Sequence, residues 1–265
     1  MKAIVLAGGK GTRLAPYTKI LPKPLMPIGD MPILEILLRQ LARCGVDEVI
    51  LTVGHLAHLL CAFFQGGERY GLKINYSYEE KPLGTAGPLS LLGGLDDTFI
   101  VTNGDVLTTL DIKQLIEFHH AHHGIATIAS HARKVRIDLG VIQTNSQHEI
   151  IGYLEKPCYD YCVSMGIYIF EPAILKYIGF NQYLDLPDLV LKLIEAGERV
   201  MSYPFDGYWM DLGRVEDYEQ AVAEFEGLKP QILGEQFVES GVNLLESRLA
   251  FQDFLAPANN KPRQP

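Results

Sequence analysis

The chain alternates short, almost continuously apolar segments with amphipathic stretches of helical length. Residues 3–6, 48–53 and 98–102 are apolar and rich in β-branched residues, which is typical of strands covered on both faces. Residues 32–44 place leucine and isoleucine at helical spacing, with charged residues on the other side and Gly45 as a stop signal. This order predicts an α/β fold whose binding site lies at the carboxyl ends of mainly parallel strands.

The pattern changes after residue 124. Short strands with turns between them are predicted over 125–130, 140–144, 150–155 and 166–170, and antiparallel pairing is expected there. Further helices are predicted over 56–64, 85–92, 112–123, 186–196 and 215–227. We therefore expect a Rossmann-like, mainly parallel mixed sheet flanked by helices, with a small antiparallel part.

The same pattern suggests how the chain is divided. We expect one domain over 1–228, with a mainly parallel half (1–124) and a half that contains the antiparallel part (125–228). Apolar residues recur over 229–255, which predicts a short helical extension that could cover the domain or meet a second subunit. Residues 256–265 are rich in proline, asparagine and lysine, so a flexible tail is expected.

Composition excludes several classes of function. With 48% hydrophobic residues over 265 positions, the chain can bury a sizeable core. A net charge of -9 argues against binding nucleic acid or anionic membrane through a general positive field. No apolar run approaches the roughly 18 residues of a membrane span, and the start lacks a signal-peptide pattern. A cytoplasmic protein is the expectation, and its four scattered cysteines predict free thiols.

The segment that follows the first strand predicts a phosphate-binding loop. Glycines allow backbone N–H groups to approach an anion, and nearby basic side chains add charge; these residues are Gly8, Gly9, Gly11, Lys10, Arg13 and Lys23. The segment matches neither a Walker A loop nor a dinucleotide fingerprint, because the required spacings are absent. An anionic substrate is therefore expected at the end of this strand.

Four more motifs follow in order: Pro82-Leu-Gly-Thr-Ala-Gly-Pro88, Asn103-Gly-Asp105, Glu155-Lys-Pro157 and Trp209-Met-Asp-Leu-Gly213. Together with the loop, in which Gly-x-Gly-Thr-Arg precedes Pro-Lys-Pro, they make residues 2–225 resemble the sugar-1-phosphate nucleotidyltransferases. The resemblance implies a nucleotide-diphospho-sugar transferase (GT-A-like) fold, a nucleoside triphosphate and a sugar 1-phosphate as partners, Mg²⁺ as cofactor, and a homo-oligomer. In such a reaction a sugar phosphate oxygen attacks the α-phosphorus in line, so no protein nucleophile is needed.

The resemblance assigns roles to individual residues. Arg13 and Lys23 would stabilise charge on the α-phosphoryl group and on the leaving pyrophosphate. Asp105 and Asp211 would hold the metal, since magnesium prefers hard oxygen ligands. The predicted nucleotide-binding residues are Leu6, Ala7, Gly8, Gly9, Lys10, Gly11, Thr12, Glu79, Pro82, Gly84, Thr85, Asn103 and Gly104.

The sugar phosphate has its own predicted residues: Gly140, Glu155, Lys156, Ser164 and Gly166. In the resemblance Lys156 holds the phosphate, Glu155 accepts hydrogen bonds from sugar hydroxyls and Gly140 allows close approach. Ser164 and Met165 stand where the family usually has asparagine and alanine. This departure weakens a mannose assignment and leaves other hexoses, heptoses and modified sugars open.

In the resemblance, the residue five positions before Gly84 faces the pairing edge of the base, and in this chain that residue is Glu79. A carboxylate only accepts hydrogen bonds, and guanine offers the adjacent donors N1–H and N2–H₂, whereas uracil and thymine present one donor flanked by acceptors. The surrounding sequence is similar to mannose-1-phosphate guanylyltransferases, which also favours GTP. Glu80 is an alternative reader of the base, and a uridylyl- or thymidylyltransferase acting on glucose 1-phosphate is the alternative activity.

Other interpretations remain open at this point. The chain could be a catalytically silent subunit that binds nucleotide sugars, although the retained basic and acidic residues argue against it. A choline-phosphate-type nucleotidyltransferase is a third interpretation. A metal site at His119 and His123 and roles for His55 and His58 are disfavoured, because the proposed reaction needs no imidazole.

Overall fold

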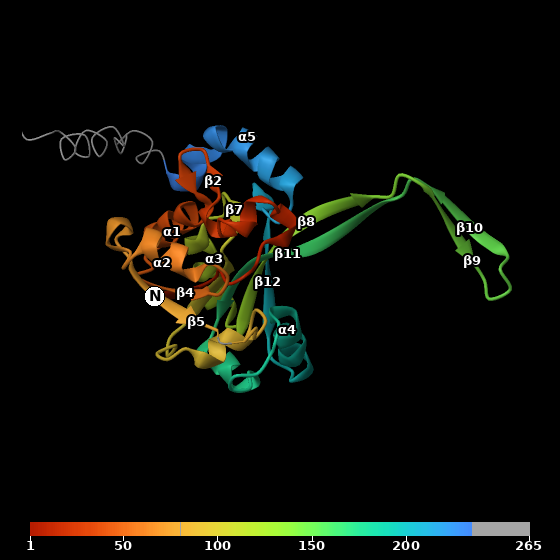
Figure 1. Cartoon of the computed structure of the whole chain (residues 1–265). Coiled ribbons are helices and arrows are strands. Elements are labelled where there is room, and N and C mark those ends of the chain that lie inside the picture. Colours follow the sequence, from red (N-terminus) through yellow and green to blue (C-terminus); the bar gives the residue numbers. More distant parts are fainter. Residues whose placement is uncertain (80, 235–265) are drawn as a thin grey trace, which may run out of the picture.

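A computed structural model of the chain describes residues 1–79 and 81–234 and contains a seven-stranded mixed sheet (Figure 1). In spatial order its strands are β12 (Val200–Phe205), β8 (Ala126–Arg136), β11 (Cys158–Phe170), β6 (Phe99–Asn103), β1 (Lys2–Leu6), β4 (Glu48–Val53) and β5 (Lys73–Tyr78). Only β11 runs against its neighbours β6 and β8, and the other pairs within this sheet are parallel. The predicted fold class is confirmed.

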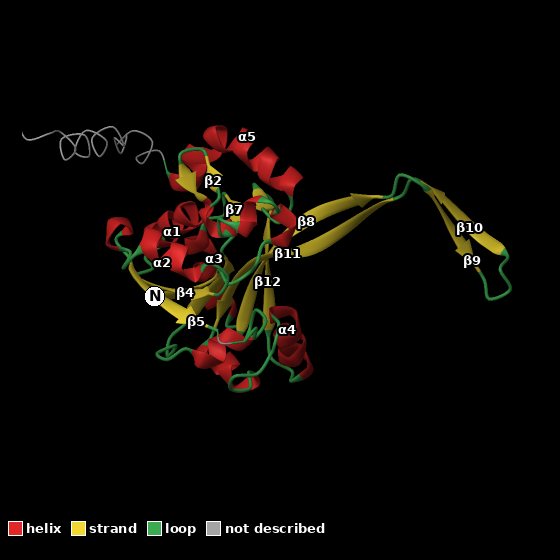
Figure 2. Cartoon of the chain, in the orientation of Figure 1, coloured by secondary structure: helices red, strands yellow, loops and turns green. Residues whose placement is uncertain are grey.

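Helices cover both faces of this sheet (Figure 2). The helices of one face are α1 (Ile33–Arg43), α2 (Ala57–Phe64) and α3 (Ile112–His122), and those of the other are α4 (Leu186–Glu195) and the 3-10 helices η5 (Gly87–Leu91) and η6 (Pro172–Tyr177). Successive side chains of a strand point to opposite faces. Ala3 and Val5 therefore pack in the first apolar cluster and Ile4 in the second. The strands are apolar throughout because both faces are buried.

A third apolar cluster joins α5 (Val215–Leu233) to α1 and to two short strand pairs. These pairs are β2 (Pro27–Ile28) with β3 (Met31–Pro32), and β7 (Val106–Thr108) with β13 (Trp209–Asp211). Phe225 is fully buried against Gly29, where φ is +59° and a side chain would meet the Phe225 ring. The helix thus continues beyond the predicted 215–227, and the later parts of the predicted extension and tail lie outside the described residues.

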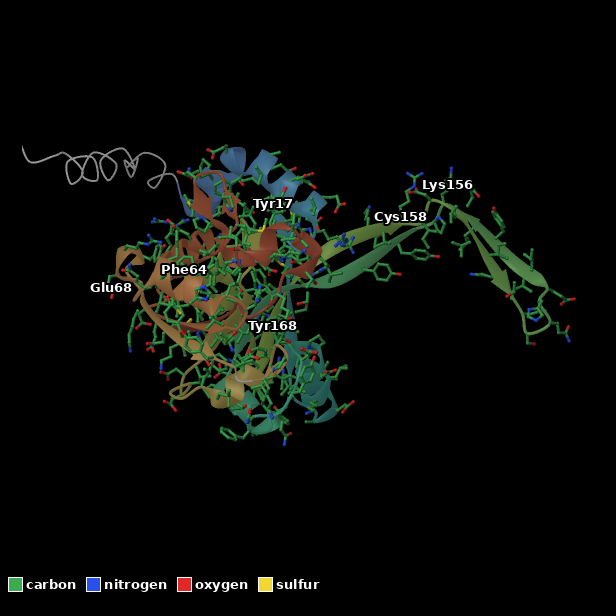
Figure 3. The ribbon with its side chains drawn as sticks, in the orientation of Figure 1. Tyr17, Phe64, Glu68, Lys156, Cys158 and Tyr168 are labelled. Atoms are coloured by element: carbon green, nitrogen blue, oxygen red, sulfur yellow. The ribbon has the colours of Figure 1, made fainter. Side chains whose placement is uncertain are left out.

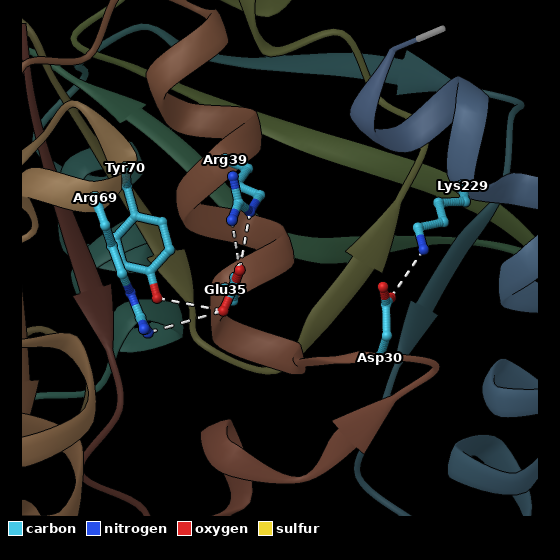
Figure 4. A network of polar contacts seen from close by, with 6 residues as sticks. All are labelled: Asp30, Glu35, Arg39, Arg69, Tyr70 and Lys229. Carbon is cyan, nitrogen blue, oxygen red and sulfur yellow. Dashed lines mark hydrogen bonds and ion pairs between the residues drawn. The ribbon is translucent and has the colours of Figure 1, made fainter. Parts of the chain in front are cut away.

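Ion pairs attach α1 and α5 to their surroundings (Figure 4). The Glu35 carboxylate accepts two hydrogen bonds from Arg39, at 2.7 and 3.0 Å, and one from the Tyr70 hydroxyl at 3.3 Å. Lys229 Nζ lies 2.8 Å from Asp30 Oδ1. These contacts fix α1 against the segment that precedes β5 and fix α5 against the β2–β3 turn.

The strands β8 and β11 continue past the sheet as a two-stranded ribbon that projects from the body (Figure 1). We call residues 130–164 the arm, its paired segments 130–136 and 158–164 the stem, and residues 137–139 with 156–157 the elbow. Beyond the elbow, β9 (Gly140–Thr144) and β10 (Ile150–Glu155) form the tip hairpin. The predicted strands 125–130 and 166–170 were too short, because β8 and β11 continue beyond the sheet into the stem, where they pair with each other alone.

His119 is a structural residue of α3. It is 1% exposed, and its ring nitrogens lie 2.7 Å from Thr127 Oγ1 and 2.9 Å from Glu171 Oε1. Burial lowers the pKa of His119 from its ordinary 6.5, although the hydrogen bond to Glu171 opposes this shift. Both ring nitrogens are used within the fold, so this histidine has no free nitrogen for a metal.

Replacing His119 with glutamine is expected to lower the free energy of unfolding by about 1–3 kcal/mol at pH 7.5, because buried polar partners lose a hydrogen bond. Since the native state disfavours the protonated ring, the wild type should lose stability as the pH falls below 6.5. The variant should lack that part of the loss. Urea unfolding at pH 5.5 and 7.5 measures both effects, and equal acid sensitivity of the two proteins would contradict the assignment.

Among the described helices, none combines the length and the apolar character that crossing a membrane requires.

Candidate active site

A cavity of about 640 Å³ opens at the carboxyl ends of β1, β4, β5 and β6. A second cavity of about 240 Å³ adjoins it beneath the glycine-rich loop and shares Leu6, Gly9, Arg13 and Asp105 with it. All thirteen residues predicted to bind the nucleotide line one or both cavities. The predicted catalytic and metal-binding residues also line these cavities: Arg13, Lys23, Asp105 and Asp211. Arg13 and Asp211 are 198 residues apart in the sequence.

The loop after β1 is held in shape by its own backbone. Gly11 has φ +60°, and its carbonyl oxygen accepts hydrogen bonds from the Leu14 N–H (2.9 Å) and the Thr18 hydroxyl (2.8 Å). A Cβ at Gly11 would lie 2.9 Å from Thr18 Cγ2. Only glycine combines this left-handed conformation with such close packing.

Replacing Gly11 with alanine is expected to weaken nucleotide binding at least about tenfold, because relief of the Thr18 contact must move the loop. The left-handed conformation adds a strain of about 1–2 kcal/mol. Gly93→Ala is the matched control, since a Cβ there meets nothing within 4 Å. Calorimetric titration with a nucleoside triphosphate measures the effect, and equal affinities of the two variants would contradict it.

Two carboxylates meet beside this loop because β7 pairs with β13. Asp105 immediately precedes β7, and Asp211, at the end of β13, is in register with Val106. The Lys23 ammonium forms an ion pair with Asp105 and lies 3.9 Å from Asp211 Oδ1. Lys23 is 8% exposed, so a buried cation is shared unequally between two acids. The Arg13 guanidinium lies against Gly213, where a Cβ would be only 2.9 Å from it.

The electrostatics of this pair suit a divalent cation. Burial raises the pKa of Asp211 above its ordinary 3.8, and the charge of Asp105 adds to the rise, while Lys23 and Arg13 oppose it. A second cation would relieve the repulsion between the two carboxylates. Hard carboxylate oxygens fit Mg²⁺, which keeps several waters and needs few protein ligands when phosphates supply the others. Within 1–79 and 81–234 no group of three or more potential metal ligands occurs, so such an ion would depend on the nucleotide phosphates.

Glu79 follows β5 and lines the main cavity. Its Oε2 accepts a hydrogen bond from the Leu83 N–H at 3.0 Å, which shapes the turn containing Pro82 and Gly84. Its Oε1 lies near Gly8: a Cβ placed on Gly8 would be 3.8 Å from this oxygen. One carboxylate oxygen of Glu79 therefore stabilises the turn, while the side chain also borders the cavity. Glu80, the alternative reader, lies outside the described residues.

Thr85 makes its side-chain hydrogen bonds to the start of α4. Its hydroxyl lies 3.2 Å from Asp185 Oδ1 and accepts the Leu186 N–H at 2.7 Å, and its own N–H donates to Asp185 at 3.0 Å. Thr85 thus joins the 82–88 turn to the start of α4. Its side-chain bonds in this structure lie within the fold, although the residue borders the cavity.

The predicted sugar-phosphate residues separate into two groups. Ser164 and Gly166 lie at the base of the arm, and a Cβ at Gly166 (φ +75°) would meet Asn103 Nδ2 at 2.5 Å. Gly140, Glu155 and Lys156 lie at or next to the elbow. Figure 3 shows Lys156 at the bend between the stem and the tip hairpin, far from Tyr168 in the body. None of these three residues lines the two cavities. One chain therefore does not assemble the complete predicted site.

Two residues that suggested an unusual sugar are used within the fold. The Ser164 hydroxyl donates to the Tyr168 hydroxyl at 3.1 Å. Met165 is 1% exposed in the first apolar cluster, and its carbonyl accepts a bond from Trp209 Nε1 at 3.0 Å. The Met165 side chain is therefore part of the core.

Several cavity residues were missed by the sequence analysis: Thr52, Gly54, His55, Lys81 and Tyr183. Three of them, Thr52, Gly54 and His55, could have been predicted from the sequence. They lie at the end of the strand predicted over 48–53, and the carboxyl ends of neighbouring parallel strands lie at the same edge of the sheet as the loop after β1. A Cβ at Gly54 would lie 2.9 Å from the Gly8 carbonyl oxygen, so the two loops touch. Tyr183 enters from a distant segment, and no sequence pattern indicates it.

Comparison with known proteins places the chain among relatives of matching fold. Residues 2–227 match the nucleotidyl transferase family. The UTP–glucose-1-phosphate uridylyltransferase of Synechocystis sp. is 38% identical over 84% of this chain and 62% of its own length. The mannose-1-phosphate guanylyltransferase of Mycobacterium tuberculosis is 34% identical, over 90% of this chain and 70% of its own. The chain thus spans about two thirds of the length of these curated relatives.

Solved structures show the same architecture. A putative glucose-1-phosphate thymidylyltransferase from Bacillus anthracis has a TM-score of 0.68 and 26% identity, covering 84% of this chain and 94% of its own. HddC from Yersinia pseudotuberculosis has a TM-score of 0.65 and 25% identity, covering 84% and 99%. The named relatives differ in the base and the sugar that their names give, so the likeness does not select a substrate pair.

Proposed function

Because the chain belongs to the nucleotidyl transferase family, we propose that it transfers a nucleotidyl group from a nucleoside triphosphate to a sugar 1-phosphate, releasing pyrophosphate, in the cytoplasm. The observation that carries this proposal is the meeting of Arg13, Lys23, Asp105 and Asp211 beside the glycine-rich loop. Residues 1–124 would supply the nucleotide side of this site and residues 125–228 the sugar-phosphate side.

The reaction needs positioning and charge stabilisation more than covalent catalysis. The backbone of residues 8–12 would hold the triphosphate, and Arg13 and Lys23 would stabilise negative charge on the α-phosphoryl group and on pyrophosphate. Asp105 and Asp211 would hold Mg²⁺, which when bound supplies a Lewis acid for the phosphate oxygens. Lys23 keeps the Asp105 carboxylate paired in the free protein and would pass to phosphate when substrate arrives.

We propose GTP as the preferred triphosphate. The Glu79 carboxylate offers only acceptors to the cavity, and its negative charge attracts the N1–H and N2–H₂ donors of guanine and repels the carbonyl oxygens of uracil and thymine. Mannose 1-phosphate or a related sugar is the proposed acceptor. Uridylyl transfer to glucose 1-phosphate is the second candidate, and the 38% identical relative favours it.

Pyrophosphate release with Mg²⁺ tests the proposal across GTP, UTP, dTTP, CTP and ATP, each with mannose 1-phosphate, glucose 1-phosphate and phosphocholine. Selective use of GTP supports the assignment, and selective use of UTP with glucose 1-phosphate establishes the second candidate. Turnover of phosphocholine alone overturns a sugar acceptor. Nucleotide-sugar binding without turnover would instead identify a catalytically silent subunit.

Replacing Glu79 with glutamine is expected to reduce the preference for GTP over UTP by about 10–100-fold in kcat/KM, because the amide adds a donor that suits the uracil carbonyls. The amide oxygen can still accept the Leu83 N–H, so the turn should persist. Glu68→Gln, on an exposed 3-10 helix, is the matched control. An unchanged preference in Glu79→Gln would refute Glu79 as the base reader.

A further inference from the structure

The arm exposes an unusual amount of apolar surface. Among the described residues, nine of the 18 large hydrophobic side chains that are exposed lie between positions 135 and 161: Val135, Leu139, Ile142, Ile150, Ile151, Tyr153, Leu154, Tyr159 and Tyr161. An isolated two-stranded ribbon is only marginally stable in water, and exposed apolar surface of this kind marks an interaction site. The arm therefore needs a protein surface to pack against.

The apolar side chains of the stem share one face. Tyr159 is in register with Val135, and Tyr161, two residues further along the same strand, is in register with Arg133. Side chains in register, and those two apart on one strand, point to the same side. The opposite face carries polar groups, including Lys134 and Asp160, whose charged atoms are 4.0 Å apart. One face of the stem is therefore suited to docking and the other to solvent.

The stem also fixes how far the elbow lies from the body. Its register runs without interruption from Ser130 opposite Ser164 to Arg136 opposite Cys158. At about 3.3 Å per residue, these six steps place the outer end of the stem, at Arg136 and Cys158, roughly 20 Å beyond the base of the arm, and Lys156 lies in the elbow two residues from Cys158. Rotation of the tip hairpin about the elbow leaves Lys156 at the elbow. While the stem keeps its register, Lys156 cannot reach the cavity of its own chain.

A groove beside the arm base could receive an elbow. This groove, of about 400 Å³, shares Arg13 and Asp211 with the main cavity, so it is continuous with the reacting end of the site. Its remaining lining comes from the arm base, β13, α5 and the segment between β13 and α5. Its basic residues are Arg13, Arg133, Lys134 and Arg214, and its acids are Asp211 and Asp217. Gly140, Glu155 and Lys156 of the same chain are absent from this lining.

We propose that two copies of this chain exchange arms, so that the elbow of each enters the groove of the other. Lys156 and Glu155 of the partner subunit then complete the sugar-phosphate site, with Lys156 on the phosphate and Glu155 on the sugar hydroxyls. Exchange of an identical element closes a symmetric dimer and covers the apolar face of both stems. This inference rests on the proposed function, since it places the predicted sugar-phosphate residues.

Two heterodimers distinguish exchanged arms from arms that each serve their own chain. Each heterodimer is made by co-expression and purified through two different tags. In the first, an Asp211→Asn chain pairs with a Lys156→Ala chain. With exchanged arms, one of its two sites combines an intact body with an intact elbow, so about half the wild-type rate is expected. In the second, a wild-type chain pairs with the Asp211→Asn/Lys156→Ala double variant. With exchanged arms each of its sites carries one defect, and almost no activity is expected.

The alternative arrangement gives the opposite result. If each arm served its own chain, the first heterodimer would be inactive and the second would retain about half of the wild-type rate. That outcome overturns the proposal, and so does inactivity of both heterodimers when the wild type is active.

A second measurement does not depend on turnover. Light scattering should give a dimer mass for the wild type and a monomer mass for Tyr159→Ser/Tyr161→Ser, because both side chains lie on the apolar stem face and are already exposed. Phe180→Ser, at a residue that is 76% exposed away from the arm, is the matched control and should remain dimeric. A monomeric wild type, or a dimeric tyrosine variant, overturns arm exchange. If no pair of substrates reacts, the proposed function is wrong. The masses measured by light scattering then still test whether the arms are exchanged.

Discussion

Replacing Asp211 with asparagine is expected to lower kcat by about 10³-fold, without loss of the fold. Metal-assisted charge stabilisation is worth several kcal/mol, and each 1.36 kcal/mol corresponds to a tenfold change in rate. The asparagine keeps the shape of the side chain but removes the charge that would hold Mg²⁺. Pyrophosphate release at saturating substrate measures the effect.

The same variant is expected to be slightly more stable than the wild type when metal is absent. Because the pKa of Asp211 is raised, its ionisation opposes folding, and this penalty grows as the pH rises above 3.8. The carboxylate is about half exposed, so the gain at pH 7 should stay below about 1 kcal/mol. It should disappear below pH 3.8, where the carboxyl is protonated in both states.

Magnesium itself gives the control for this prediction. Added Mg²⁺ with nucleotide should raise the Tm of the wild type and have little effect on Asp211→Asn, since ligand binding stabilises only the state that binds. Glu216→Gln, an exposed carboxylate on α5, should behave as the wild type. Full activity of Asp211→Asn, or equal stabilisation of both proteins by Mg²⁺, would refute the metal-binding role.

Replacing Lys23 with methionine is expected to reduce both activity and stability. Lys23 is the buried cation beside Asp105 and Asp211, and its loss leaves the two carboxylates facing each other. We expect kcat/KM to fall by about 10³-fold, because charge on the departing pyrophosphate loses a preorganised donor. The free energy of unfolding should fall by about 1–2 kcal/mol, less than for a fully buried pair, because Asp211 is half exposed.

Two further variants separate these effects. Lys23→Arg restores the charge and should recover most of the stability, but the larger guanidinium cannot place one donor at the same point, so activity should remain low. Lys19→Met removes an exposed lysine of the same loop and should change neither quantity. Urea unfolding with kinetics on the same preparations makes the comparison, and wild-type kinetics in Lys23→Met would contradict a role in catalysis.

The local pattern along the chain was enough to predict most elements of the body. The helix predicted over 32–44 is α1 (Ile33–Arg43), and the strand predicted over 48–53 is β4 (Glu48–Val53). These predictions succeeded because both faces of the sheet are buried, so hydrophobic periodicity reports secondary structure directly. The stem of the arm was missed for the opposite reason, since a ribbon that leaves the body shows no buried face.

That the proposed nucleotide-binding residues line adjoining cavities could also be predicted, because these residues follow strands that neighbour β1 and must meet at one edge. The finer contacts could not. Nothing in the sequence indicates that the Thr85 hydroxyl bonds to Asp185, a hundred residues away, or that Met165 points into the core. Such bonds depend on which loops the fold brings together.

The sequence by itself determined the fold class and the residue types available for phosphate and metal chemistry. These follow from local periodicity and from motifs that each lie within one short segment. Only the tertiary structure decided which of these motifs share a site. The pairing of β7 with β13 brings Asp211 to Asp105, whereas the unbroken register of the stem holds the elbow, with Lys156, about 20 Å from the base of the arm. Neither the proximity of Asp211 to Asp105 nor the position of the elbow can be read from separation along the chain, because strand pairing determines both.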